Sequence, residues 1–217
     1  MKKTLIGMVL MFLSVFVIAS GANARPLPPT SDWAISYYEQ AIGYNILPKG
    51  LYKLDGTENL IREDTAEFLV KIYDSLTDEK VKATRPSPFD DTNDKYVLRA
   101  KRLGLVAGTM EGTFLPKEEI TREDLCKVSY QLIKMFDPDC SFDLSTLSEG
   151  DLFLDHNKIY DGGSNIDAYR EAIYGLRDLG LIKGYEDRCF RPQGTVTCEE
   201  AVVFYVGLYE YLQDIIN

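Results

Sequence analysis

The sequence has 217 residues, with 24 Lys and Arg against 34 Asp and Glu, for a formal net charge of −10 at pH 7. This acidic balance argues against nucleic acid or an anionic membrane as a partner, although a local site can still bind an anion. His156 is the only histidine and the chain has no CxxC pair, so neither a metal site nor a cofactor is expected.

The first 24 residues have the three regions of a secretory signal peptide. Lys2 and Lys3 precede an uncharged apolar run from Leu5 to Ala19, and Ala22-Asn23-Ala24 supplies small residues for cleavage. We predict cleavage after Ala24 and a secreted protein. Loss of the two lysines leaves 22 − 34 = −12 charges. No later stretch offers about 18 apolar residues, so no transmembrane segment is expected.

A helix that ends at a Gly or Asn residue recurs three times after the proline-rich segment at the start of the mature chain. The first copy runs from Trp33 to Asn45, and the later copies end in RLGLVAG around Gly104 and DLGLIKG around Gly180. Gly and Asn tolerate the left-handed conformation that closes a helix. In the later copies a turn with an aromatic residue and then a proline follows, ending at Pro116 and Pro192.

A second helix follows each turn, and the clearest copy runs from Ile120 to Phe136. Thr121 and Asp124 predict a reciprocal capping box at its start. Its apolar stripe comprises Leu125, Cys126, Ser129, Leu132, Ile133 and Phe136. In the first copy Ile61 replaces the capping threonine, which removes about 1 kcal/mol of helix stabilisation. The third copy, 197–213, is apolar on most sides and suits a central position.

These repeats predict an all-α fold. Because a unit of about 60 residues with two helices cannot bury both apolar faces, three helix-turn-helix repeats should pack around one shared core, with the three second helices at its centre. The predicted parts are the signal peptide 1–24 and repeats 25–86, 87–146 and 147–217, joined by polar linkers. The repeats leave no room for a catalytic domain.

Arg122 stands at the first position of the second helix in the middle repeat. A cation there faces the positive end of the helix dipole and loses a few tenths to about 1 kcal/mol. A salt bridge to a carboxylate such as Glu119 would offset this cost. The alternative is an anion site, because free N–H groups at the helix start and the arginine fork converge on one point.

The four cysteines do not form the pattern of a disulfide scaffold. Cys126 lies on an apolar helix face and is expected in the core, whereas Cys189 and Cys198 are close enough in sequence to form a disulfide.

The order of these elements resembles the S-layer homology (SLH) modules of exported bacterial proteins. The middle repeat carries Phe89, Asp91, Leu103-Gly104-Leu105, Gly108, Gly112, Phe114, Pro116 and Ile120-Thr121-Arg122-Glu123. The resemblance extends from about Asp32 to Leu212. It implies a pseudo-threefold bundle of three modules around a central three-helix core. It also implies non-covalent attachment to an anionic secondary cell-wall polysaccharide, typically one bearing pyruvate ketals. In this family the ligand lies in grooves between modules, where the arginine that opens the second helix reaches the ketal carboxylate.

The resemblance also implies ligand-binding positions. Arg62 and Arg122 hold the family's arginine position, whereas Cys198 holds it in the third repeat, so at most two grooves are expected to be competent. The further positions implied are Asp91, Asp155, Trp33, Gly108 and Gly184. The two aspartates fit either a sugar-hydroxyl acceptor or a turn cap, and Trp33 fits either stacking on a sugar or ordinary packing.

Other functions have weaker support in the sequence. The chain has no nucleophile elbow, phosphate loop or metal-ligand cluster, so an enzyme is not expected. The acidic stretches 90–94 and 161–165 lack the EF-hand pattern and fit helix-capping turns better than calcium sites. The alternative is a protein–protein interaction or S-layer co-assembly module that contacts other surface-layer proteins without glycan binding.

Overall fold

The computed structural model describes residues 26–160 and 166–217, so the predicted signal peptide and the acidic stretch 161–165 lie outside the described residues. The α-helices of the described part are α1 (Ile35–Gly43), α2 (Arg62–Leu76), α3 (Lys95–Arg102), α4 (Arg122–Phe136), α5 (Ile166–Asp178) and α6 (Cys198–Ile216). Short 3-10 helices are η1 (Asp32–Ala34), η2 (Gly50–Lys53), η3 (Leu144–Thr146), η4 (Glu149–Asp151) and η5 (His156–Lys158). Extended pairing among these residues is limited to isolated bridges, so the prediction of an all-α fold is confirmed.

The predicted closing residues of the first helices adopt the left-handed conformation. The φ angle is 59° at Asn45, 77° at Gly104 and 74° at Gly180. Gly and Asn adopt this conformation at low cost, and it turns the chain out of the helix toward the loop that follows.

The starts of the second helices differ in their caps. The Thr121 hydroxyl accepts from the Asp124 N–H at 3.2 Å. The Asp124 carboxylate accepts from the Thr121 and Tyr169 hydroxyls instead of returning to the Thr121 N–H, so the predicted reciprocal box is only half formed. An aspartate is one methylene shorter than the glutamate of such a box. The complete box joins Thr197 and Glu200, and Ile61 provides no side-chain cap, as predicted.

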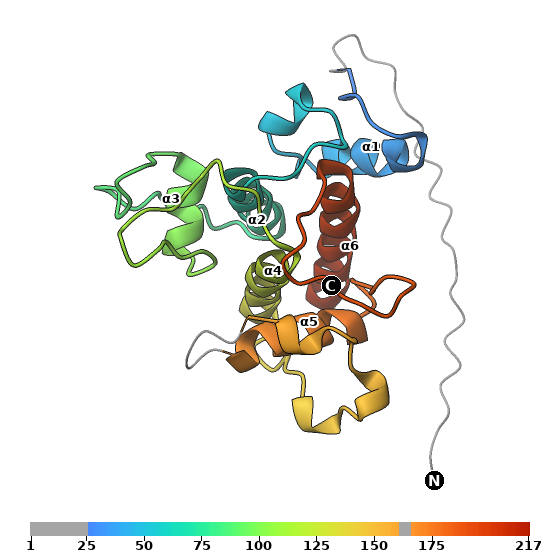
Figure 1. Cartoon of the computed structure of the whole chain (residues 1–217). Helices are drawn as coiled ribbons and strands as arrows, with labels where there is room; N and C mark the ends of the chain where they lie inside the picture. Colours follow the sequence, from blue (N-terminus) through green and yellow to red (C-terminus); the bar gives the residue numbers. More distant parts are fainter. Residues whose placement is uncertain (1–25, 161–165) are drawn as a thin grey trace.

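The three second helices lie at the centre of the molecule (Figure 1). α2, α4 and α6 contact one another pairwise, while α3 packs on α2, α5 on α4 and α1 on α6. An outer helix therefore covers the central helix of the preceding repeat, and contact between α1 and α6 joins the two ends of the described chain. The pseudo-threefold bundle as a whole stays a prediction.

The same backbone junction recurs where each central helix begins. Its first two N–H groups donate to carbonyls of another repeat: Arg62 to Glu118 at 2.9 Å, Glu63 to Pro116 at 3.1 Å, Arg122 to Gly194 at 2.8 Å, Glu123 to Pro192 at 3.1 Å, Cys198 to Glu58 at 2.8 Å and Glu199 to Gly56 at 2.9 Å. These bonds satisfy donors that a helix start otherwise leaves free. The three junctions fix the repeats relative to one another.

The four cysteines are free. Cys126 is buried, as predicted. The suggested disulfide between Cys189 and Cys198 is wrong, because both thiols are free. The carbonyl of Phe190, next to Cys189, accepts from Arg122. The N–H of Cys198 donates to Glu58.

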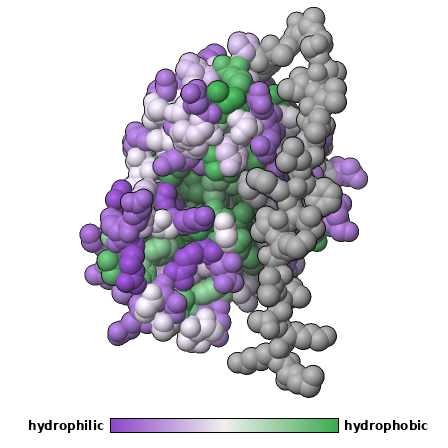
Figure 2. Space-filling view, turned by 90° about the vertical axis from the view of Figure 1, so that its right-hand side faces the viewer, coloured by the Kyte–Doolittle hydropathy of each residue, from purple (hydrophilic) through white to green (hydrophobic). Residues whose placement is uncertain are grey.

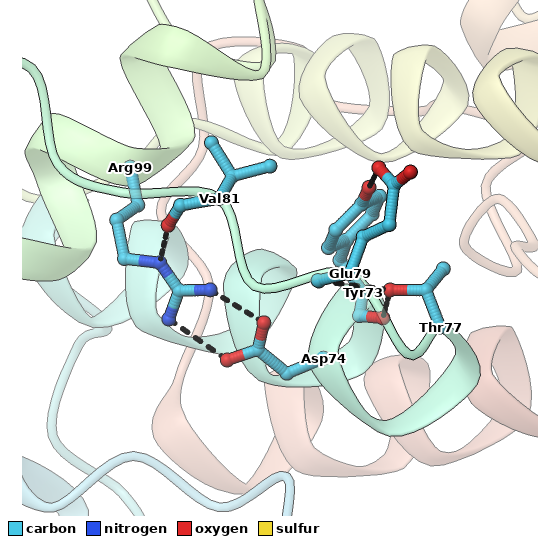
Figure 3. Close-up of polar contacts among 6 residues, drawn as sticks. All are labelled: Tyr73, Asp74, Thr77, Glu79, Val81 and Arg99. Carbon is cyan, nitrogen blue, oxygen red and sulfur yellow. Dashed lines mark hydrogen bonds and ion pairs between the residues drawn. The ribbon is translucent and has the colours of Figure 1, made fainter.

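An arginine on α3 fixes the linker between the first two repeats (Figure 3). Arg99 donates to both carboxylate oxygens of Asp74, with Nη1 at 2.8 Å, and its Nε donates to the Val81 carbonyl at 2.6 Å. The side chain of Arg99 is 13% exposed and that of Asp74 is 23% exposed. The guanidinium group of Arg99 therefore connects α3 both to α2 and to the linker.

We expect Arg99→Ala to lower the free energy of unfolding by about 2 kcal/mol, because it leaves a poorly solvated carboxylate and a carbonyl without their donor. Urea unfolding followed by circular dichroism measures the change. Arg102→Ala, at the exposed end of the same helix, is the matched control and should change stability by less than about 0.5 kcal/mol. Equal effects of the two changes would contradict a structural role for Arg99.

Candidate functional site

Arg62, the first residue of α2, reaches into the second repeat. Its Nε donates to the Phe114 carbonyl at 2.9 Å and one Nη to the Ala107 carbonyl at 3.3 Å. The guanidinium carbon lies 4.8 Å from the centre of the Phe114 ring. Two carbonyls and one aromatic face therefore fix the guanidinium and leave donors directed elsewhere.

Arg122, the first residue of α4, has the same setting in the third repeat. Its Nε donates to the Phe190 carbonyl at 2.9 Å and one Nη to the Lys183 carbonyl at 3.3 Å. The guanidinium carbon lies 4.8 Å from the centre of the Phe190 ring and 4.9 Å from that of Tyr185. The two predicted arginines are thus held in equivalent ways.

The predicted aspartates hold the turns that carry these aromatic residues. Asp91 accepts from the N–H groups of Phe114 and Leu115 at 2.8 and 2.7 Å. Asp155 is buried and accepts from the N–H groups of Phe190 and Arg191, both at 2.8 Å. Leu115 and Arg191 have a φ of 59°, a conformation unfavourable for their side chains. Of the two interpretations left open, the structure thus shows the turn cap.

The predicted glycines allow two aromatic rings to approach the backbone. A Cβ on Gly108 or Gly184 would lie 2.5 Å from a ring carbon of Phe89 or Phe153, respectively. Gly108 also lines the groove at Arg62. Both glycines therefore allow the loops beside the arginines to pack closely, because they have no Cβ that would clash with the ring.

The two interpretations of Arg122 both need correction. Glu119 accepts from the Asn59 side chain, and neither Arg62 nor Arg122 lies within ion-pair distance of a carboxylate among the described residues. The helix-start N–H groups are not free either, because the junction carbonyls already accept from them. The donors available to an anion are those of the guanidinium alone.

Each arginine lines a groove between repeats. Groove 1, at Arg62, has a volume of about 610 Å³ and is lined by Arg62, Thr65, Lys101, residues 104–109, Phe114, Leu115, Glu118, Ile120, Asp124, Lys127, Val128, Gln131 and Tyr169. Groove 2, at Arg122, is smaller, at about 180 Å³, and is lined by Arg122, Leu125, Cys126, residues 181–183, Phe190, Val196, Glu200, Val203 and Phe204.

Hydrophobic residues predominate in groove 2, which α6 and the loop after α5 help to form. Figure 2 shows the side of the molecule on which these two segments lie, with a hollow whose floor is hydrophobic and whose surroundings carry hydrophilic residues. A ligand in groove 2 would meet one arginine beside a largely apolar wall.

The third junction has a different chemistry. Cys198, in place of the arginine, is buried. The loop that follows α1 packs directly on α2: the Lys49 N–H donates to Glu67 at 3.2 Å, and the Lys71 ammonium donates to the Leu47 carbonyl. The expectation of at most two competent grooves is consistent with this arrangement. Trp33 is 54% exposed and is not among the residues that line groove 1 or groove 2.

Asp64 is a buried carboxyl group beside this third junction. A Cβ on Gly50 would lie 2.6 Å from its Oδ1, which shows how closely the loop approaches. Burial, with Glu63 and Glu67 nearby, raises the pKa of Asp64 from 3.8 to about 7. Between these values the folded protein keeps a proton that the unfolded chain has released, so the free energy of unfolding falls as pH rises through this range.

Asp64→Asn should therefore remove part of this pH dependence. We expect the variant to gain stability relative to the parent as pH rises from 5 to 8, with a limit of about 1.4 kcal/mol per pH unit. Urea unfolding at a series of pH values measures the difference. If the free energy of unfolding depends on pH in the same way for the two proteins, the pKa of Asp64 is not raised in the folded state and the prediction is wrong.

The described residues show no arrangement suited to a metal. No group of three or more His, Cys, Asp and Glu side chains within 26–160 and 166–217 is placed to hold an ion. In the stretch 90–94, Asp91 caps the turn already described, and Asp94 accepts from the N–H groups of Tyr96 and Val97 at the start of α3. Both acids thus serve as caps.

Fold and site together define a helical repeat protein whose inter-repeat grooves carry preorganised arginines. Residues 88–126 and 163–202 match the family model of the S-layer homology domain. The resemblance seen in the sequence is confirmed for these two segments. Residues 25–86 lie outside the matched segments, so a third such module there stays a prediction.

Three relatives have names that refer to the cell surface, to the anchoring of a cellulosome or to a surface layer. The chain is 29% identical over 186 residues to "Cell surface glycoprotein 1" of Acetivibrio thermocellus (82% of this chain, 7% of the relative). It is 28% identical over 164 residues to "Cellulosome-anchoring protein" of the same organism (71% and 32%), and 27% identical over 128 residues to "Surface layer protein" of Brevibacillus choshinensis (59% and 10%). The chain thus matches at most about a third of the length of these relatives. No helix within the described ranges is long and apolar enough to cross a membrane.

Proposed function

We propose that this protein is an exported, non-catalytic wall-binding protein that attaches non-covalently to anionic cell-wall polysaccharide through grooves 1 and 2. The observation that carries the proposal is the twofold occurrence of an arginine fixed by two carbonyls and an aromatic ring without a described carboxylate partner. Such a fork is complementary to a carboxylate, including that of a pyruvate ketal.

The match of two segments to the S-layer homology domain and the names of the relatives support a place at the cell surface. In this proposal Arg62 and Arg122 bind the ligand. Asp91 and Asp155 hold the turns that position these arginines, and Gly108 and Gly184 admit the neighbouring rings. The third junction does not bind, because it lacks the arginine and its loop is closed on α2.

Sedimentation with purified cell-wall sacculi tests the proposal. The mature chain, residues 25–217, should sediment with intact sacculi and remain in solution when the polysaccharide has been removed chemically. Equal binding to intact and stripped sacculi would instead favour the alternative, a module that contacts another surface protein or the peptide part of the wall.

A further inference from the structure

The three junctions differ at one position of the central helix. This position, five residues after the arginine or its replacement, holds Lys127 in α4, Val203 in α6 and Glu67 in α2. Lys127 lines groove 1 and Val203 lines groove 2, while Glu67 accepts from the loop that closes the third junction. This helix position thus carries a cation, an apolar side chain or a carboxylate that is paired with Lys71.

Groove 1 gathers cations that have no carboxylate partner. Arg62, Lys101 and Lys127 all line it, and none of the three lies within ion-pair distance of an Asp or Glu in the part of the chain that the structure describes. Glu118 and Asp124 also line the groove, but both oxygens of Asp124 accept from hydroxyl groups. Three cations without an ion-pair partner around one groove repel one another, and a bound anion would relieve this repulsion.

The Lys127 ammonium is held in place at the groove wall. Its Nζ donates to the Tyr169 hydroxyl at 3.3 Å and lies 4.3 Å from the centre of the Tyr169 ring. The Tyr169 hydroxyl in turn donates to Asp124 at 3.0 Å, and the other oxygen of Asp124 accepts from Thr121. Asp124 is thus occupied by two hydroxyls, and Lys127 keeps donors for a ligand.

We propose that Lys127 forms a second anion subsite in groove 1, so that Arg62 and Lys127 together bind a glycan segment with two anionic groups. Groove 2 binds one anionic group at Arg122, because Val203 stands at the position of Lys127. The other cation that lines groove 2, Lys183, lies on the exposed loop after α5. Lys127 therefore determines which groove takes the more highly charged part of the polysaccharide. This inference rests on the proposed function for the identity of the ligand.

The test exchanges the two wall residues. Lys127→Val places the residue of groove 2 in groove 1, Val203→Lys does the reverse, and Lys82→Val on the exposed linker is the control with the same change of net charge. Isothermal titration calorimetry with purified wall polysaccharide measures binding. We expect Lys127→Val to weaken it about tenfold, Val203→Lys to strengthen it, and Lys82→Val to leave it within about twofold.

A second probe separates the inference from the proposed function. Trigalacturonate supplies several carboxylates and galacturonate one, and NMR titration locates each of them on the protein. The inference predicts a preference for trigalacturonate over galacturonate at groove 1 that Lys127→Val removes.

The outcomes distinguish the two claims. If the wild type binds polysaccharide and Lys127→Val binds equally well, the second subsite is wrong and the proposed function stands. If polysaccharide fails to bind but trigalacturonate shifts the NMR signals of groove 1 in the wild type and not in Lys127→Val, the proposed function fails and the anion subsite stands. If polysaccharide fails to bind and trigalacturonate causes no such shift, both are wrong.

Discussion

Replacing Arg62 and Arg122 together by alanine is expected to weaken binding to wall polysaccharide at least about a hundredfold. A hydrogen bond to a charged group contributes about 1.5–3 kcal/mol, which corresponds to a factor of ten or more at each arginine. Arg62→Ala alone should have a larger effect than Arg122→Ala, because groove 1 is the larger of the two and Lys127 stands there at the position that Val203 holds in groove 2. Calorimetry with the isolated polysaccharide measures all three affinities.

Lysine at these positions separates charge from geometry. Arg62→Lys keeps the positive charge but loses the planar fork that bonds to the Phe114 and Ala107 carbonyls while facing the groove. We expect its affinity to lie between those of the parent and Arg62→Ala. Arg102→Ala on the exposed end of α3 controls for net charge. If Arg62→Ala and Arg102→Ala bind as the parent does, the assignment of Arg62 is wrong.

Asp155→Ala is expected to cause the largest loss of stability among the site residues, about 2–4 kcal/mol in the free energy of unfolding. The residue is buried, and its removal leaves the N–H groups of Phe190 and Arg191 without their acceptor. One of these groups belongs to a residue with a left-handed backbone, so the turn also loses the bonds that hold that conformation.

The equivalent residue of the second repeat provides the comparison. Asp91 makes the same two bonds to Phe114 and Leu115 but is exposed, so water can replace its carboxylate. Asp91→Ala should therefore lose less stability than Asp155→Ala while weakening ligand binding in groove 1 through Phe114. Urea unfolding gives the stabilities, and a smaller loss for Asp155→Ala than for Asp91→Ala would contradict this account.

The helices could be predicted because their signals are local. Thr121 and Thr197 lie directly before the helices they cap, and Asn45, Gly104 and Gly180 close theirs through their own backbone conformation. The half-formed box at Thr121 shows the limit, since the partner that diverts the Asp124 carboxylate is Tyr169, 45 residues away.

The setting of the arginines could not be predicted in the same way. Arg62 bonds to carbonyls 52 and 45 residues away, and Arg122 to carbonyls 68 and 61 residues away. The sequence therefore indicated an anion site at Arg122 but assigned it helix-start N–H groups that the junctions already use. The sequence showed Phe114 and Phe190 as the aromatic residues of a turn motif, but not their contact with the arginines.

Lys127 was missed altogether. A lysine on the less apolar side of an amphipathic helix has the pattern of an ordinary solvated residue. Only the packing of α4 beside the loop after α3 brings it into the same groove as Arg62. The sequence offers one retrospective signal, the difference among Lys127, Val203 and Glu67 at equivalent helix positions.

The central claim is that the guanidinium groups of Arg62 and Arg122 contact an anionic wall polysaccharide. NMR observation of the arginine Nε–H signals during titration with the isolated polysaccharide tests it most directly, with assignments from Arg62→Lys and Arg122→Lys. The account predicts that these two signals shift and saturate with the polysaccharide, while the signal of Arg99, which is paired with Asp74, stays unchanged. Binding that shifts other residues and leaves both signals in place would contradict it.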